Sequence, residues 1–158
     1  MNWYLGPIDS YLEDIKKLFS KNINHKHAQN YLKYPLFNYT KFSRMAWDND
    51  LIYYSAGIER PEYNGSVRIM SRHTRCRKYD FGTRSDDLMR GLITLDESTQ
   101  YALNIGYKDI WISREESPKL LEYFSKNSRY NWSISYEQIP GSGSWATNQY
   151  QYILRLEQ

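Results

Sequence analysis

A long amphipathic segment in the middle of the chain, residues 86–104, separates two short strand-like segments, residues 66–72 and 108–113. Leucines recur along the long segment at helical spacing, and Gly106 follows its end, as is usual for a helix. A strand, a helix and a second strand in succession form a crossover unit, in which the two strands run parallel in one sheet. This unit constrains the fold more than any other feature of the sequence.

The segments around this unit predict further strands and helices. Residues 44–47 and 51–58 are β-prone runs on either side of Asp48-Asn49-Asp50, which indicates a hairpin. The other expected elements are a strand at 3–6, helices at 10–22 and 26–34, a helix from Ser117-Pro118, and strands at 132–139 and 150–156. The order predicts an α/β (α+β) fold, with a mixed, mostly antiparallel central sheet and helices on both faces, in a single domain over residues 1–158.

Composition excludes several classes of protein. Cys76 is the one cysteine among 158 residues, which rules out an internal disulfide framework and a CxxC metal site. No apolar run approaches the roughly 18 residues that a membrane-spanning helix needs, and the N-terminus lacks the basic start and apolar run of a signal peptide. We therefore expect a cytoplasmic protein with no membrane segment and no metal site.

Positive charge is concentrated between residues 68 and 84, although the whole chain carries a net charge of only +3. Asp80 is the one acidic residue of this stretch, against Arg68, Arg72, Arg75, Arg77, Lys78 and Arg84. A local basic cluster on a nearly neutral protein is typical of a defined anionic ligand site, and we expect a phosphate-bearing ligand. The alternative is a solvated basic loop.

The order of elements, with these residues, resembles the GNAT superfamily of acyl-CoA-dependent N-acyltransferases over about residues 3–156. Residues 46–58 resemble its second and third strands, with the Ala-Gly ending at Ala56-Gly57, and residues 67–72 stand where its fourth strand is expected. The composition is similar to that of small, divergent GNAT-like proteins of phages. The resemblance implies transfer of an acyl group from acetyl-CoA, or a related acyl-CoA, to a primary amine of a small molecule or peptide.

In the GNAT superfamily, the loop after the fourth strand carries a pyrophosphate-binding pattern, Gln/Arg-x-x-Gly-x-Gly/Ala. Residues 77–82 resemble this pattern at Arg77 and Gly82, but Asp80 stands at the middle glycine. Amides at the start of a helix bind the pyrophosphate, and glycine permits its close approach, so Asp80 removes both room and favourable charge. The cofactor-binding residues that the resemblance implies are Ile69, Met70, Ser71, Arg72, Arg77, Lys78, Phe81, Gly82, Thr83 and Arg84.

Two interpretations of this departure remain open. In the first, cationic side chains such as Arg72, Arg75 and Arg77 replace the amide contacts, because arginines hold phosphates through bidentate hydrogen bonds. In the second, the acyl-CoA site has been lost, and the GNAT scaffold serves as a catalytically inactive binding protein. A hypothesis from another class is a nucleic-acid-binding module, in which residues 68–84 follow phosphates while tyrosines stack on bases.

N-acyl transfer needs a neutral amine, a polarised thioester carbonyl and an acid for the departing thiolate. The resemblance assigns the acid to Tyr123, on the helix after the fifth strand; the alternative is that Tyr123 simply packs beside Leu120 and Phe124. Glu59, just after Gly57-Ile58, is the candidate base, acting directly or through water. Its alternative is a solvated carboxylate at the end of a strand.

Overall fold

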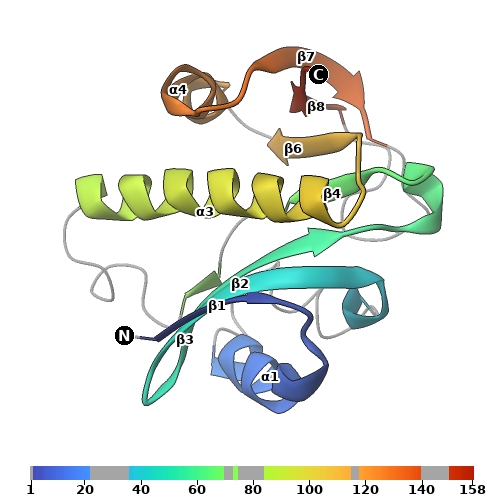
Figure 1. Ribbon diagram of the computed structural model, residues 1–158. Coiled ribbons are helices and arrows are strands. Elements are labelled where there is room, and N and C mark those ends of the chain that lie inside the picture. Colours follow the sequence, from blue (N-terminus) through green and yellow to red (C-terminus); the bar gives the residue numbers. More distant parts are fainter. Residues whose placement is uncertain (1, 22–35, 70–72, 75–83, 115–117, 140–149) are drawn as a thin grey trace.

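Eight strands form one sheet in a computed structural model of the protein, which describes residues 2–21, 36–69, 73–74, 84–114, 118–139 and 150–158. The sheet order is β1-β2-β3-β4-β6-β8-β7, and β5 pairs with β3 (Figure 1). The strands are β1 (Asn2–Gly6), β2 (Thr40–Asp48), β3 (Asp50–Ile58), β4 (Val67–Ile69), β5 (His73–Thr74), β6 (Ile110–Arg114), β7 (Trp132–Gln138) and β8 (Tyr150–Leu156). The α-helices are α1 (Leu12–Lys21), α3 (Arg84–Asn104) and α4 (Lys119–Asn127), and 3-10 turns span Asp9–Tyr11, Leu36–Tyr39 and Pro61–Tyr63.

The predicted fold class is confirmed, because the sheet is mixed, mostly antiparallel, and packed with helices on both faces. The predicted hairpin is present as well, since β2 and β3 pair antiparallel down to Asp48↔Asp50. Asn49 makes the turn in the left-handed region, at φ 64°, where asparagine is found more often than most residues. The helix predicted at 26–34 lies outside the described residues, and β5 is a strand that the sequence pattern does not predict.

β4 and β6 are the one parallel pair of strands in the described part of the chain. They pair at Val67↔Ile110 and Arg68↔Trp111, and α3 lies between them in the chain, as the crossover pattern predicts. Each has an antiparallel neighbour on its other side, β3 beside β4 and β8 beside β6. The parallel pair therefore lies inside the sheet, with β1–β3 on one side and β7–β8 on the other (Figure 1).

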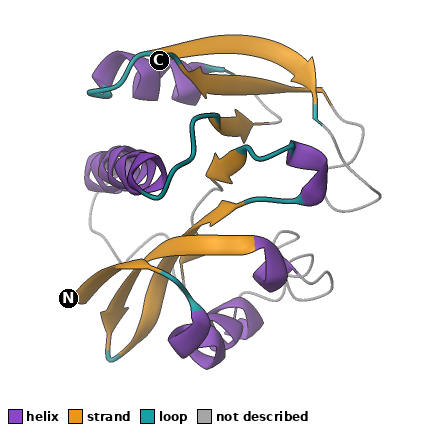
Figure 2. Ribbon diagram, turned by 45° about the vertical axis from the view of Figure 1, so that its right-hand side comes forward, coloured by secondary structure: helices purple, strands orange, loops and turns teal. Residues whose placement is uncertain are grey.

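The helices divide between the two faces of the sheet (Figure 2). Ile15, Leu18 and Phe19 of α1 pack on one face, in the same cluster as Trp111 of β6. On the other face, Ala102 of α3 and Leu121 of α4 pack against a cluster from four strands: Phe42, Val67, Ile69, Ile110, Ile112 and Leu154. Successive residues of a strand point to opposite faces, which is why β6 contributes to both clusters.

The side of α3 that lies against the sheet is partly polar. Leu92 and Ala102, from the predicted apolar face, are buried as expected. Thr94, Ser98 and Thr99 are buried with them, each at most 2% exposed. The leucine spacing of this segment does not predict three buried hydroxyl side chains. Thr99 donates to the Leu95 carbonyl of its own helix at 2.7 Å, whereas Thr94 has partners on the sheet.

Arg44 of β2 is the main partner of this polar side. Its guanidinium donates a hydrogen bond of 2.6 Å to Oγ1 of Thr94 and one of 2.8 Å to the carboxylate of Glu97. The Tyr53 hydroxyl donates to the same Thr94 oxygen at 2.7 Å, and the Trp3 ring lies 3.9 Å from the guanidinium. Burying a charged group is expensive unless it is paired and hydrogen-bonded, so the polar residues of α3 allow Arg44 to lie inside the fold.

Thr94→Val is expected to lower the free energy of unfolding by about 2–3 kcal/mol, because it removes an acceptor used by a buried arginine and a buried tyrosine. Valine keeps the shape of threonine, so the change tests the hydroxyl rather than the packing. Urea denaturation measures the effect. Thr94→Ser is the control, since it keeps the hydroxyl; an equal loss in both variants would show that the methyl group, not the oxygen, carries the interaction.

Candidate active site

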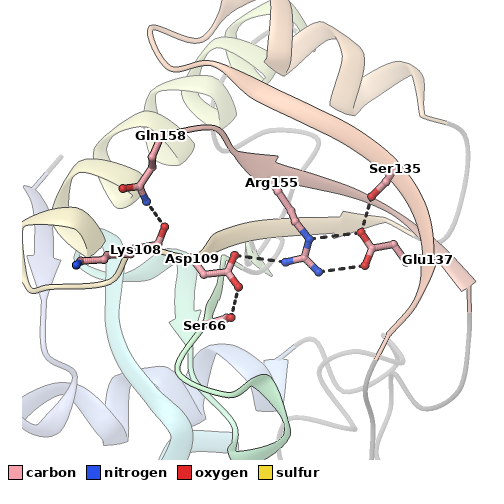
Figure 3. A network of polar contacts seen from close by, with 7 residues as sticks. All are labelled: Ser66, Lys108, Asp109, Ser135, Glu137, Arg155 and Gln158. Atoms are coloured by element: carbon pink, nitrogen blue, oxygen red, sulfur yellow. Dashed lines mark hydrogen bonds and ion pairs between the residues drawn. The ribbon is translucent and has the colours of Figure 1, made fainter.

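The beginnings of β4 and β6 are tied together by polar contacts that also involve β7 and β8 (Figure 3). The Val67 amide donates to the Asp109 carbonyl at 3.0 Å, and the Ser66 hydroxyl donates to the Asp109 carboxylate. Arg155 of β8 pairs with that carboxylate at 3.4 Å and with Glu137 of β7 at 3.1 Å. The hydrogen bond from Arg155 is the main cause that lowers the pKa of Glu137, which keeps this carboxyl charged. The parallel pair is thus held firmly where its two strands begin.

Tyr123 of α4 lies against α3. Its hydroxyl is 3.9 Å from Sδ of Met89, in the second turn of that helix. Leu121 and Phe124 are buried on either side of Tyr123 in the sequence, and the Phe124 ring meets the tyrosine ring edge-on at 5.9 Å. A thioether sulfur is only a weak acceptor, so the phenol proton remains available for a stronger one. The ring packs as a helix-surface tyrosine would, while the hydroxyl reaches toward α3.

Glu59 follows the end of β3 and accepts a hydrogen bond from the hydroxyl of Tyr107. Its own amide donates to the Tyr39 carbonyl at 2.9 Å. Tyr107 lies between α3 and β6, and its amide donates to the Ala102 carbonyl at 3.0 Å. Burial, together with the bond to Glu59, raises the pKa of Tyr107, so this tyrosine stays protonated and continues to donate. Glu59 therefore joins the end of β3 to the end of α3.

The two catalytic candidates lie at opposite ends of α3. Tyr123 contacts Met89, whereas Glu59 contacts Tyr107, which comes three residues after the helix ends at Asn104. The helix between Met89 and Asn104 rises about 22 Å. An acid and a base of one transfer step must both come within hydrogen-bond reach of the reacting groups. The structure does not bring Glu59 and Tyr123 to one reacting centre.

No protein-family model and no curated protein sequence matches this chain. Solved structures match it over nearly its whole length. An acyl-CoA N-acyltransferase from Pseudomonas aeruginosa has a TM-score of 0.61 at 14% identity, covering 98% of this chain and 97% of that chain. An aminoglycoside 6'-acetyltransferase type Ii has a TM-score of 0.58 at 10% identity, covering 98% and 96%. A GNAT-family protein from Desulfovibrio desulfuricans has a TM-score of 0.54 at 10% identity, covering 99% and 98%.

The chain has the GNAT fold. The resemblance drawn from the order of elements is confirmed at this level, and the low identities make the chain a divergent example of the fold. Similarity of this kind establishes the arrangement of strands and helices, while activity depends on particular side chains.

The predicted cofactor-binding residues fall mostly in the connection between β4 and α3 of this GNAT fold. The structure describes two of them: Ile69, buried in β4 and paired with Gly57, and Arg84, whose backbone begins α3. The others lie outside the described residues: Met70, Ser71, Arg72, Arg77, Lys78, Phe81, Gly82 and Thr83.

Met89 and Tyr107 are contacts of the two catalytic candidates that sequence reasoning missed. Met89 is 34 residues from Tyr123, and Tyr107 is 48 residues from Glu59. No local spacing connects residues so far apart, so the GNAT fold alone brings them together. Within the described residues, no three His, Cys, Asp or Glu side chains gather as metal ligands. A helix with the length and apolar character to cross a membrane is likewise not found there.

Proposed function

We propose that the protein is an N-acyltransferase that moves an acetyl or related acyl group from acyl-CoA to a primary amine of a small molecule or peptide, as a single domain in the cytoplasm. The observation that carries the proposal is the position of Tyr123, held by α4 against α3 in a GNAT fold. Two solved structures of this fold are an acyl-CoA N-acyltransferase and an aminoglycoside 6'-acetyltransferase. They support acyl-CoA as the donor and an amine as the acceptor.

The donor pyrophosphate would bind between β4 and α3. We assign it to the basic side chains Arg72, Arg77, Lys78 and Arg84, with Gly82 allowing close approach of the backbone. α3 is 21 residues long and begins at Arg84, so the amides of its first turn carry the partial positive charge of a helix N-terminus. In this proposal the cationic side chains compensate for Asp80, which stands where a glycine would leave room.

Tyr123 would act as the general acid. The amine nitrogen attacks the thioester carbonyl, a C–N bond forms, and the C–S bond breaks. The phenol proton of Tyr123 passes to the departing thiolate, the excess proton of the amine passes to solvent, and solvent returns a proton to the Tyr123 phenolate. We do not give that second proton to Glu59, because its carboxylate is engaged by Tyr107 at the far end of α3.

Acetyl-CoA is expected to raise the melting temperature of the protein. A ligand that binds the native state alone, at about 100 times its Kd, stabilises that state by about 2.7 kcal/mol. For a chain of this size, the gain corresponds to a rise of roughly 5–10 °C. Differential scanning fluorimetry with acetyl-CoA measures it directly.

Arg77→Ala should reduce the shift, because it removes a charge assigned to the pyrophosphate. Lys16→Ala is the matched control, since Lys16 is an exposed cation on α1, on the opposite face of the sheet, paired loosely with Glu13 at 3.9 Å. If millimolar acetyl-CoA did not change the melting temperature of the wild-type protein, the proposal would be contradicted. The interpretation of the chain as an inactive GNAT scaffold would then remain.

A further inference from the structure

Two buried serine hydroxyls lack a hydrogen-bond partner within the described residues, those of Ser43 and Ser113. Ser43 is 0% exposed and Ser113 is 8% exposed. Both are on the face covered by α1, because Ser43 lies opposite Ala56 and Ser113 lies opposite Ile153, two members of the cluster on that face. An unpaired buried hydroxyl costs about 1–3 kcal/mol, so each of these serines needs an explanation other than stability.

The surroundings of Ser43 explain it by size. It lies in the middle of three paired antiparallel strands, between Gly6 of β1 and Ala56 of β3. Both neighbours have little or no side chain, and Ser43 is a third small residue in the same row. Its place in the sheet therefore requires a small side chain, and size alone accounts for a serine at this position.

Ser113 lies in different surroundings. It belongs to β6, two residues beyond Arg68↔Trp111, the last pair of β4 and β6 in the described residues. On its other side, β6 pairs with β8 from Trp111 to Arg114, and Ser113 faces Ile153, a large apolar side chain. The hydroxyl is thus buried beside the parallel pair, at the end away from the polar contacts that hold the beginnings of the two strands.

We propose that the Ser113 hydroxyl donates a hydrogen bond to the carbonyl oxygen of the bound acyl group; the assignment rests on the proposed function. The donor would reach the sheet between the later parts of β4 and β6, where Ser113 is located. Tyr123 would approach the thioester sulfur from the face of the sheet that α4 covers. Ser113 would approach the carbonyl oxygen from the face that α1 covers. As the C–N bond forms, negative charge grows on that oxygen and strengthens the hydrogen bond. Ser113 keeps its proton throughout, and the thiolate takes its proton from Tyr123.

The test compares the affinities of acetyl-CoA and of CoA, which lacks the acyl carbonyl. Isothermal titration calorimetry on Ser113→Ala should show a Kd for acetyl-CoA raised about 5- to 10-fold, the effect of one lost hydrogen bond. The Kd for CoA should stay the same. Ser43→Ala is the matched control, a second unpaired serine on the same face, and it should leave both affinities unchanged. Urea denaturation should find both alanine variants at least as stable as the wild type, since each removes an unsatisfied hydroxyl.

The outcomes separate this inference from the proposed function. Unchanged acetyl-CoA affinity in Ser113→Ala overturns the assignment while leaving the acyltransferase proposal in place. An equal loss of affinity for acetyl-CoA and for CoA in Ser113→Ala also overturns the assignment, because it indicates a change in packing rather than a lost contact with the carbonyl. Failure of the wild-type protein to bind acetyl-CoA removes the proposed function, and the role of Ser113 with it.

Discussion

Gly57→Ala is expected to lower the free energy of unfolding by about 3 kcal/mol, at the upper end of what overpacking a protein core usually costs. A Cβ atom at Gly57 would lie 2.2 Å from Cζ and 2.3 Å from Cε1 of Phe42, its cross-strand partner. Phe42 is completely buried and packs 4.9 Å from the ring of Tyr101 in α3, so it has nowhere to move. Urea denaturation measures the loss of free energy, and thermal denaturation should show a fall in melting temperature of roughly 6–12 °C.

A double-mutant cycle with Phe42→Leu isolates the cause. Leucine removes the ring atoms that the new methyl group would strike, so Gly57→Ala should be much less damaging in that background. The two changes should therefore be non-additive, as expected for residues in direct contact. Additive effects would show that alanine disturbs the β3 backbone instead of meeting the Phe42 ring.

Tyr123→Phe is expected to reduce the proposed acetyl transfer about 100-fold, within the range contributed by a general acid, while the affinity for acetyl-CoA should stay nearly the same. Among the described residues, the hydroxyl bonds only to the weakly accepting sulfur of Met89, so its loss should leave the stability of the fold unchanged. Thiol release from acetyl-CoA, with a polyamine or an aminoglycoside as acceptor, measures turnover. Melting curves of the variant check its folding.

Tyr136→Phe is the control for this experiment, because Tyr136 is a tyrosine of β7 that is 59% exposed. It should turn over acetyl-CoA as fast as the wild type. Equal rates in the wild type and Tyr123→Phe would mean that the thiolate takes its proton from elsewhere. If Tyr123→Phe lost acetyl-CoA affinity together with its rate of acetyl transfer, Tyr123 would be a binding residue rather than the general acid.

The order of strands and helices was predictable because local patterns report it. The β-prone run of residues 51–58, the turn at Asn49 and the long helical period before Gly106 each depend on residues near one another in the chain. β6 begins at Ile110, two residues later than predicted, because Asp109 accepts a hydrogen bond from Ser66 and forms an ion pair with Arg155. Such ends depend on tertiary partners, which no local pattern contains.

The candidate site was harder to predict, for the same reason. Glu59 is close in sequence to Gly57, which suggested a place at the catalytic centre, but its hydrogen bond to Tyr107 holds it beside the end of α3. The buried hydroxyl of Thr94 is likewise explained by Arg44, fifty residues earlier in the chain. Tyr123 was found from the resemblance to a family, not from its own spacing, and its contact with Met89 depends on how two helices pack.

The parallel pair also bears on how the molecule assembles. β2 pairs with β3, and β7 pairs with β8, each with its neighbour in the chain, whereas Val67↔Ile110 joins residues 43 positions apart. Closing longer loops loses more chain entropy, and distant pairings form slowly. The hairpins β2–β3 and β7–β8 can therefore form early, and the pairing of β4 with β6 follows later. The place where acyl transfer is proposed comes into being only when β4 and β6 pair, so a growing chain has no such place until the strand after α3 has joined the sheet.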